Sequence, residues 1–262
     1  MPVDQDLLYV VSGFVVGVIV GLTGVGGGSL MTPLLVMAFG IHPKTAVGTD
    51  LLYSAITKIF GTAMHHNGKT VDWQIVRRLA YGSVPTTLLT ILVLGHMVKT
   101  GKEMGEAISF VLGIALLLTS IATLLRTQIV AFANERWGEP SDAQVARWTV
   151  ISGAVLGVLV SISSVGAGAL GVTALLLIYP RVPTMRIVGS DIAHSVPLTL
   201  IAGAGHWWFG DVDMGLMWNL LAGSIPGIVL GSWLAPRSSD FGLRSALAAV
   251  LMAVGARLVH IY

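Results

Sequence analysis

The sequence predicts an all-α, polytopic integral membrane protein built from two homologous repeats. Three observations lead to this fold class: an apolar composition, apolar runs long enough to cross a bilayer, and motifs that recur in the second half. Of the 262 residues, 54% are hydrophobic and only 11% are charged, whereas a soluble domain carries about 25% charged residues. Lipid solvates such a chain, and its 32 glycines suit the close packing of membrane helices.

Ten apolar runs predict the helices. Because a spanning helix needs about 20 apolar residues, we expect spanning helices at 5–24, 46–66, 73–95, 104–125, 148–166, 187–208, 214–235 and 243–261. The runs at 29–40 and 168–180 cover only about 18–20 Å, less than a hydrocarbon core of about 30 Å. Each half should therefore hold a broken first helix plus a half-helix, which gives roughly 8–10 helical segments in all.

One long polar stretch divides the chain. We assign residues 1–125 to the first transmembrane repeat, 126–147 to a polar linker and 148–262 to the second transmembrane repeat. The chain begins with an acidic segment, unlike the basic start of a signal peptide, so the first apolar run should be a retained helix.

The two halves carry the same residues at matching places. The offset is 140 positions and becomes 141 after one inserted residue. Duplicated halves with helices broken at corresponding positions are typical of secondary transporters. The alternative is a duplication that only built a stable bundle, in which rows such as Gly13, Gly17 and Gly21 serve close helix packing. The matched pairs include Gly13 and Gly153, Gly17 and Gly157, Gly28 and Gly168, Pro43 and Pro183, Asp50 and Asp191, His65 and His206, and Asp72 and Asp213.

The basic residues favour inverted halves over parallel ones. Cytoplasmic loops are rich in Lys and Arg. With inverted halves and an external N-terminus, ten basic residues lie inside and four lie outside, whereas parallel halves split them about evenly. We therefore expect the two repeats to cross the membrane in opposite directions.

The Gly-rich segment 21–29, with Pro33, the segment 46–50 and His65, resembles the sulfite exporter TauE/SafE family of membrane permeases. Segments 164–168 and 188–191, with His206, resemble the same pattern in the second half, although Ala167 replaces a glycine and no proline matches Pro33. The likeness covers nearly the whole chain. It implies export or uptake of small sulfur-containing anions, such as sulfite or organosulfonates.

The predicted breaks are candidate substrate-binding sites. Glycines let a backbone unwind without a Cβ penalty, and the freed N–H groups at a half-helix start suit an oxyanion. The alternative is a tight helix crossing that needs small residues. The candidate cradle comprises Gly24, Gly26, Gly27, Gly28, Ser29 and Thr32 in the first half and Ser163, Ser164, Gly166 and Gly168 in the second.

Asp50 and Asp191 are candidate coupling or gating residues. Ionisable groups at membrane depth are costly and usually functional, and a carboxylate there could take up and release a proton during transport. The alternative is a helix N-cap, because Thr49 with Asp50, and Ser190 with Asp191, lie near the predicted helix starts.

Lys58 and three histidines complete the candidate coupling set. Lys58 lies two helical turns beyond Asp50 and could attract an anion or pair with a carboxylate; the alternative is a side chain that snorkels to the interface. His65, His194 and His206 could relay protons. For His65 and His206 the alternative is an interfacial position beside the aromatic belt of Trp207 and Trp208.

These residues predict a secondary transporter of a small anion that could be proton-coupled. The resemblance narrows the anion to a sulfur-containing oxyanion. We expect a multi-pass protein of the inner (plasma) membrane, with a small anionic substrate and membrane lipid as partners; a homo-oligomer is compatible with the sequence. Basic residues are scattered, so no nucleic acid is expected. With no nucleotide motif, no cysteine and no metal-ligand spacing, we expect no cofactor, no metal and no catalytic residue.

Two other functions stay open. One is an intramembrane acid–base enzyme using Asp50 and Asp191, which would require the two carboxylates to lie within hydrogen-bond reach of a reacting group. The other is a membrane scaffold subunit, although the short polar linker leaves little surface beside interfaces of roughly 800 Å² per partner.

Overall fold

A computed structural model describes residues 5–23, 28–100, 105–136, 141–235 and 241–261. Side chains of residues 133–136, 241–247 and 260–261 are left out of the description. The described part is all helical, as predicted, and has no strand. Its eleven helices are α1 (Gln5–Thr23), α2 (Gly28–Met37), α3 (Pro43–Asn67), α4 (Trp73–Lys99), α5 (Gly105–Leu124), α6 (Arg126–Arg136), α7 (Asp142–Ser163), α8 (Ala169–Ile178), α9 (Thr184–Trp208), α10 (Met214–Leu234) and α11 (Phe241–Ile261).

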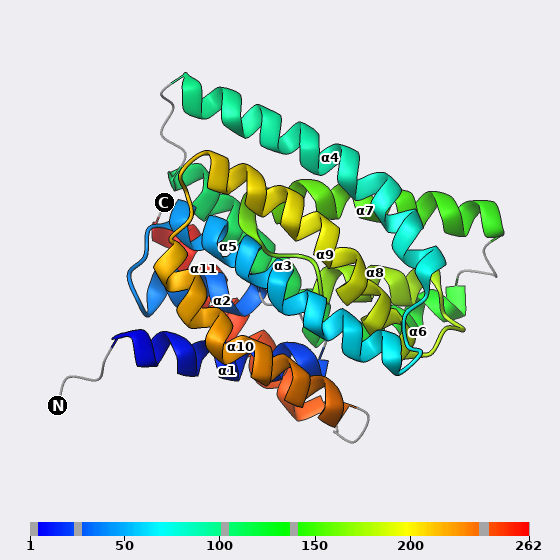
Figure 1. Ribbon diagram of the computed structural model, residues 1–262. Coiled ribbons are helices and arrows are strands. Elements are labelled where there is room, and N and C mark those ends of the chain that lie inside the picture. The colour runs from blue at the N-terminus through cyan, green and yellow to red at the C-terminus, as the bar shows by residue number, and fades with distance from the viewer. Residues whose placement is uncertain (1–4, 24–27, 101–104, 137–140, 236–240, 262) are drawn as a thin grey trace.

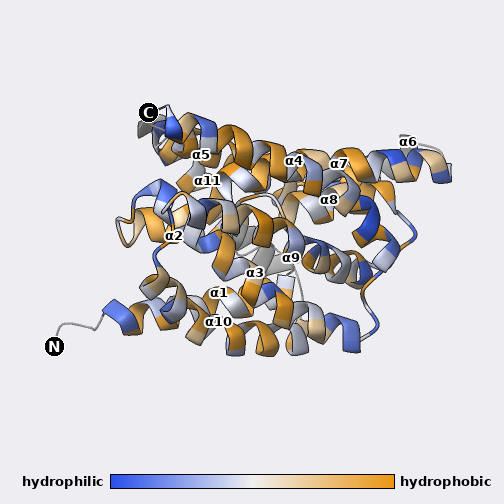
Figure 2. Cartoon of the chain, turned by 45° about the horizontal axis from the view of Figure 1, so that its top comes forward, coloured by the Kyte–Doolittle hydropathy of each residue, from blue (hydrophilic) through white to orange (hydrophobic). Residues whose placement is uncertain are grey.

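The long helices form a layered bundle with α3 and α9 at its centre. Helix α1 packs on α10 along one side, α4 packs on α7 along the opposite side, and α3 and α9 pack on each other between them (Figure 1). Helix α10 also contacts α3, and α4 contacts α9. Hydrophobic residues cover most of the helix lengths, and hydrophilic ones gather toward helix ends and loops (Figure 2), as expected of a bundle solvated by lipid.

Six described helices, α1, α4, α5, α7, α9 and α10, are long and apolar enough to cross a membrane. The chain is therefore a multi-pass membrane protein. Helix α3 has 25 residues but is not among the six, because its sequence includes Asp50, Lys58, His65 and His66. Its central position shields it from lipid, so it can carry polar residues that a lipid-facing helix cannot.

One half-helix follows the first long helix of each half, as predicted. Helices α2 and α8 have 10 residues each, which is about 15 Å of helix. Between α7 and α8, Ser164, Gly166 and Gly168 have φ angles of 59°, 125° and 114°, so the chain is broken there as the glycines predicted. In the first half α1 ends at Thr23 and α2 begins at Gly28; Gly24, Gly26 and Gly27 lie outside the described residues.

Contacts between the halves come in matched pairs. A β-carbon at Gly17 on α1 would lie 2.6 Å from the backbone oxygen of Ser224 on α10, and one at Gly157 on α7 would lie 2.7 Å from that of Ser83 on α4. The glycine rows therefore serve close helix packing. The pairing supports the expected repeat, whereas the opposite orientation of the halves in a bilayer stays a prediction.

Three sequence predictions need correction. The expected count of 8–10 segments omitted α6, because a search for apolar runs cannot find a polar helix. Helix α3 begins at Pro43 after His42, and α9 begins at Thr184 after Pro183. Asp50 and Asp191 therefore lie inside their helices, and the N-cap interpretation is wrong for both.

Candidate functional site

A cluster of polar side chains fills the interface between α3 and α9. Asp50, Lys58, Asp191 and His194 each expose 3% or less of their surface. Helix α3 supplies the first two and α9 supplies the others. Because groups of this kind are costly at membrane depth and usually functional, the cluster is the leading candidate site.

Three hydroxyl groups donate hydrogen bonds to the carboxylate of Asp50. Thr32 on α2 and Ser164 in the α7–α8 break both donate to Oδ2 at 2.7 Å, and Ser54, one turn along α3, donates to Oδ1 at 3.2 Å. All four residues are buried. Asp50 therefore links α2, in the first half of the chain, to the α7–α8 break in the second half.

Asp191 occupies the matching position but has a different environment. In the part of the chain that the structure describes, neither carboxylate oxygen has a hydrogen-bond partner within standard geometry, although the Gly168 backbone N–H acts on it electrostatically. The carboxylate lies against the first turn of α8, where a β-carbon at Gly171 would overlap Oδ1. Glycine is required there because the side chain of Asp191 occupies the space.

Lys58 is the cation of the cluster, and its ammonium group is attracted by both carboxylates. No salt bridge within 4.0 Å joins it to a carboxylate among the described residues. The structure does not support the snorkelling alternative, because Lys58 is 3% exposed. No lysine occupies the matching position in α9, so the charge of the site is asymmetric.

Further hydroxyl groups line the cluster, and sequence reasoning missed most of them. His194 Nε2 lies 2.8 Å from Ser83 Oγ on α4, and Thr57 Oγ1 lies 2.7 Å from Ser224 Oγ on α10. Ser83 and Ser224 are a matched pair within the repeat, and that pairing was the signal that could have found them.

The predicted cradle is only partly assembled. Gly28 lies so close to the break that a β-carbon would overlap the backbone oxygen of Ser164. Ser29 Oγ is buried without a partner among the described residues, and it is the hydroxyl of the cradle that remains available. Ser163 instead caps its own break, donating to Leu159 O at 2.7 Å and accepting from Val165 N at 3.2 Å.

Thr49 and Ser190 bind the starts of neighbouring helices. Thr49 Oγ1 accepts a hydrogen bond from the backbone N–H of Asp213 at 2.9 Å, and Ser190 Oγ accepts one from Asp72 N–H at 2.8 Å. Asp213 and Asp72 are the N-caps of α10 and α4. Both hydroxyls therefore fix where α3 and α9 meet the next helix, which is a structural task.

His65 and His206 close the turns at the ends of α3 and α9. His65 Nδ1 lies 2.8 Å from Thr70 Oγ1, and His206 lies 2.9 Å from Ser161 O through Nε2 and 3.4 Å from Asp211 Oδ2 through Nδ1. Both histidines are buried, so their side chains lie inside the protein, and their position at the membrane interface stays a prediction. Trp207 and Trp208 are exposed.

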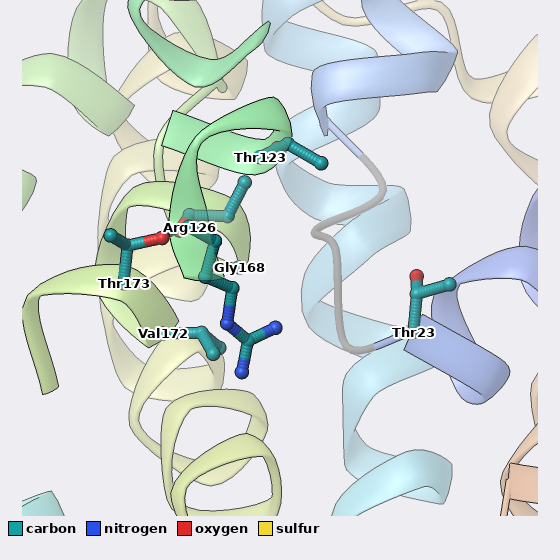
Figure 3. Close-up of a pocket in the computed structure, with 7 residues that line it drawn as sticks. Thr23, Thr123, Arg126, Gly168, Val172 and Thr173 are labelled. Atoms are coloured by element: carbon teal, nitrogen blue, oxygen red, sulfur yellow. Dashed lines mark hydrogen bonds between the residues drawn. The ribbon is translucent and has the colours of Figure 1, made fainter. Parts of the chain in front are cut away.

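A pocket opens beside the break between α7 and α8. Its empty volume, including the open mouth, is about 220 Å³. The side chain of Arg126 extends toward Val172, and Thr23 lines the pocket from the end of α1 (Figure 3). Arg126 is 7% exposed. The sequence signal that could have found it is a lone arginine directly after an apolar run. The remaining lining residues are Thr123, Gly168, Ala169, Val172 and Thr173.

Asp50 and Asp191 share no hydrogen bond, since Asp50 is held by three hydroxyls and Asp191 has no partner among the described residues. The arrangement does not form the paired carboxylates that an acid–base enzyme would use. A long-helix bundle with a helix broken at a buried cluster of charges and hydroxyls instead defines a membrane transport protein.

The comparisons with known proteins agree with that class. The family model of the sulfite exporter TauE/SafE matches residues 9–258, and the chain belongs to this family of membrane transporters. It is 39% identical over 251 residues to the "Probable membrane transporter protein YjnA" of Bacillus subtilis (strain 168), which covers 95% of this chain and 98% of that protein.

More distant relatives have similar names. The chain is 23% identical over 252 residues to the "Probable membrane transporter protein YdhB" of the same organism, covering 92% of this chain and 95% of the relative. It is 25% identical over 246 residues to a "Probable membrane transporter protein" of Xylella fastidiosa (strain 9a5c), covering 91% and 88%. No solved structure matches.

Proposed function

We propose that this protein is a secondary transporter of a small sulfur-containing oxyanion, such as sulfite or an organosulfonate, in the plasma (inner) membrane. The observation that carries the proposal is that the buried Lys58 interacts electrostatically with Asp50, whose carboxylate is surrounded by hydroxyl groups that can donate to an oxyanion. The family match supports the substrate class. A small anion is the partner that such a site would recognise, because a desolvated cation with nearby donors favours negative charge.

The hydroxyl donors suggest how an anion enters. Thr32 and Ser164 now donate to Asp50, and Ser29 Oγ is free among the described residues. An arriving oxyanion would compete with Asp50 for the first two donors and use the third directly. Substrate binding would thereby release α2 from the break between α7 and α8, which links binding to a movement of one half against the other.

Flux in proteoliposomes tests the proposal. The purified protein would be reconstituted and given sulfite, isethionate, taurine, sulfate, nitrate and chloride, with and without an imposed pH gradient. Protein-dependent flux of sulfite or isethionate, saturable and faster than that of nitrate and chloride, is expected. Absence of protein-dependent flux for every anion would contradict the proposal.

A charge variant connects the flux to the site. Lys58→Met keeps an unbranched side chain that is one atom shorter and removes its charge, so anion flux should fall at least about tenfold, since the buried cation is the main attraction for the anion. Lys44→Met, on the first turn of α3 and outside the cluster, is the matched control and should transport as the wild type does. Equal fluxes for the two variants would remove Lys58 from the proposed site.

A further inference from the structure

Asp50 and Asp191 are equivalent in sequence and unequal in surroundings. Asp50 accepts three hydrogen bonds, which stabilise an ionised carboxylate. Asp191 is 1% exposed, and neither oxygen has a hydrogen bond of standard geometry among the described residues. An unpaired buried carboxylate is stable only if it binds a proton or if a cation approaches it.

Lys58 is the cation that acts on Asp191. Helix α9 packs on α3, α4, α7 and α8. From α3 come Lys58 and Asp50, and α8 contains no ionisable residue. Helix α4 presents Ser83 to His194, and none of its ionisable residues, Arg77, Arg78, Tyr81, His96 and Lys99, acts on Asp191. The ionisable residues of α7 are Asp142 and Arg147, at its start, four or more turns before the break. Lys58 is therefore the one charged group that acts on Asp191 among the described residues. An anion that binds Lys58 would weaken the electrostatic attraction between Lys58 and Asp191.

The Arg126 pocket and Asp191 both contact the first turn of α8. Gly168, Ala169 and Val172 line the pocket, whereas Gly171 places no side chain between the α8 backbone and Asp191. The pocket and the carboxylate therefore share the residues of one helix turn. Water in the pocket would be a proton source for Asp191.

We propose that Asp191, and not Asp50, carries the coupled proton, and that the Arg126 pocket is its route from one side of the membrane. The inference rests on the proposed function and assigns its coupling step. A proton from pocket water adds to the Asp191 carboxylate when an anion binds Lys58, because the bound anion takes up the positive charge that Asp191 otherwise uses. When the site opens to the other side, the anion leaves Lys58 and the proton leaves the Asp191 carboxyl to water there, which restores the carboxylate.

Isethionate is a suitable probe because its sulfonate does not titrate near neutral pH. Liposomes carrying each variant would be assayed twice: for exchange of labelled isethionate at equal pH, and for net uptake driven by an imposed pH gradient, with an internal pH dye reporting protons. The ratio of driven uptake to exchange measures coupling.

Asp191→Asn should lower this ratio at least about tenfold, because an amide cannot carry the proton. Asp142→Asn, an exposed carboxylate at the start of α7, is the control and should keep the wild-type ratio. If Asp191→Asn loses both activities, Asp191→Glu decides: recovery of driven uptake supports the inference, and no recovery overturns it.

Other outcomes separate the two proposals. A wild-type protein that exchanges isethionate but ignores the pH gradient overturns the inference and leaves the proposed function intact. An Asp50→Asn variant that alone loses coupling, while Asp191→Asn retains it, also overturns the inference. A wild-type protein that moves none of the anions of the panel overturns the proposed function itself.

Discussion

The surroundings of Asp50 and of Asp191 differ more than their sequences do. Both follow a Gly-Thr or Gly-Ser pair on a central helix. Thr32, Ser54 and Ser164 surround the first with hydroxyl donors, whereas the second faces the bare backbone of Gly171. The two carboxylates occupy matching positions in the sequence, yet Asp50 accepts hydrogen bonds from α2 and from the α7–α8 break, whereas Asp191 accepts none of standard geometry among the described residues.

The largest expected effect concerns stability at these two positions. Asp50→Ala leaves three buried hydroxyls without their acceptor and should lower the free energy of unfolding by about 3–5 kcal/mol. Asp191→Ala removes no hydrogen bond of standard geometry among the described residues and should cost less than about 1.5 kcal/mol. Thermal unfolding in detergent measures both. Equal losses would mean that Asp191 has partners as strong as those of Asp50.

The next largest loss of stability is expected where α1 crosses α10. Gly17→Ala places a methyl group 2.6 Å from the backbone oxygen of Ser224, and backbone cannot move away cheaply, so a loss of about 1–3 kcal/mol is expected. Gly68→Ala is the control, since its nearest neighbour would be 3.5 Å away. The same unfolding assay applies. A Gly17→Ala protein as stable as the control would show that α1 and α10 can separate without cost.

Ser164→Ala tests the link between the halves. It removes one of the two 2.7 Å bonds to Oδ2 of Asp50, and a hydroxyl-to-carboxylate bond contributes about 1.5–3 kcal/mol. Ser163→Ala is the neighbouring comparison, because that hydroxyl bonds only within its own break and should cost about 1 kcal/mol. A larger loss for Ser163→Ala would reverse the assigned roles.

The smallest expected loss of stability concerns two hydroxyl groups at matching positions in the two halves. Thr49→Val and Ser190→Ala each remove an acceptor for a neighbouring helix start, so each should cost about 1 kcal/mol. Their losses should agree within about 0.5 kcal/mol, because the bonds occupy matched positions. Denaturant titration of the two variants side by side is the measurement. A large difference would show that the halves tolerate damage unequally at these sites.

The sequence predicted the helices well, because apolar runs and glycine breaks report local physics. Eight long runs and two short ones all became helices, and the glycines at 166 and 168 have the positive φ that a break requires. Helix α6 was missed since its polar residues give no hydropathy signal. Helix starts were misplaced by several residues because a proline at the first turn, Pro43, extends a helix beyond its apolar run.

The sequence predicted which polar residues form the candidate site but not which residues they bond to. Asp50, Lys58, Asp191 and His194 do meet in one buried cluster. What the sequence could not give is which hydroxyl faces which carboxylate, since the bond from Ser164 to Asp50 joins residues 114 positions apart. The Arg126 pocket was also hidden, because it depends on three segments that meet only in the folded chain.

The pairing of α1 with α10 has a consequence for biogenesis. Helix α1 ends at Thr23 and its partner begins at Met214, so at about 5–20 residues per second the ribosome needs roughly 10–40 s to deliver the partner. Until then the glycine groove of α1 faces lipid or an insertase. Helix α1 must therefore wait in the membrane without its partner, and a chain truncated before residue 214 would be a substrate for quality-control proteolysis.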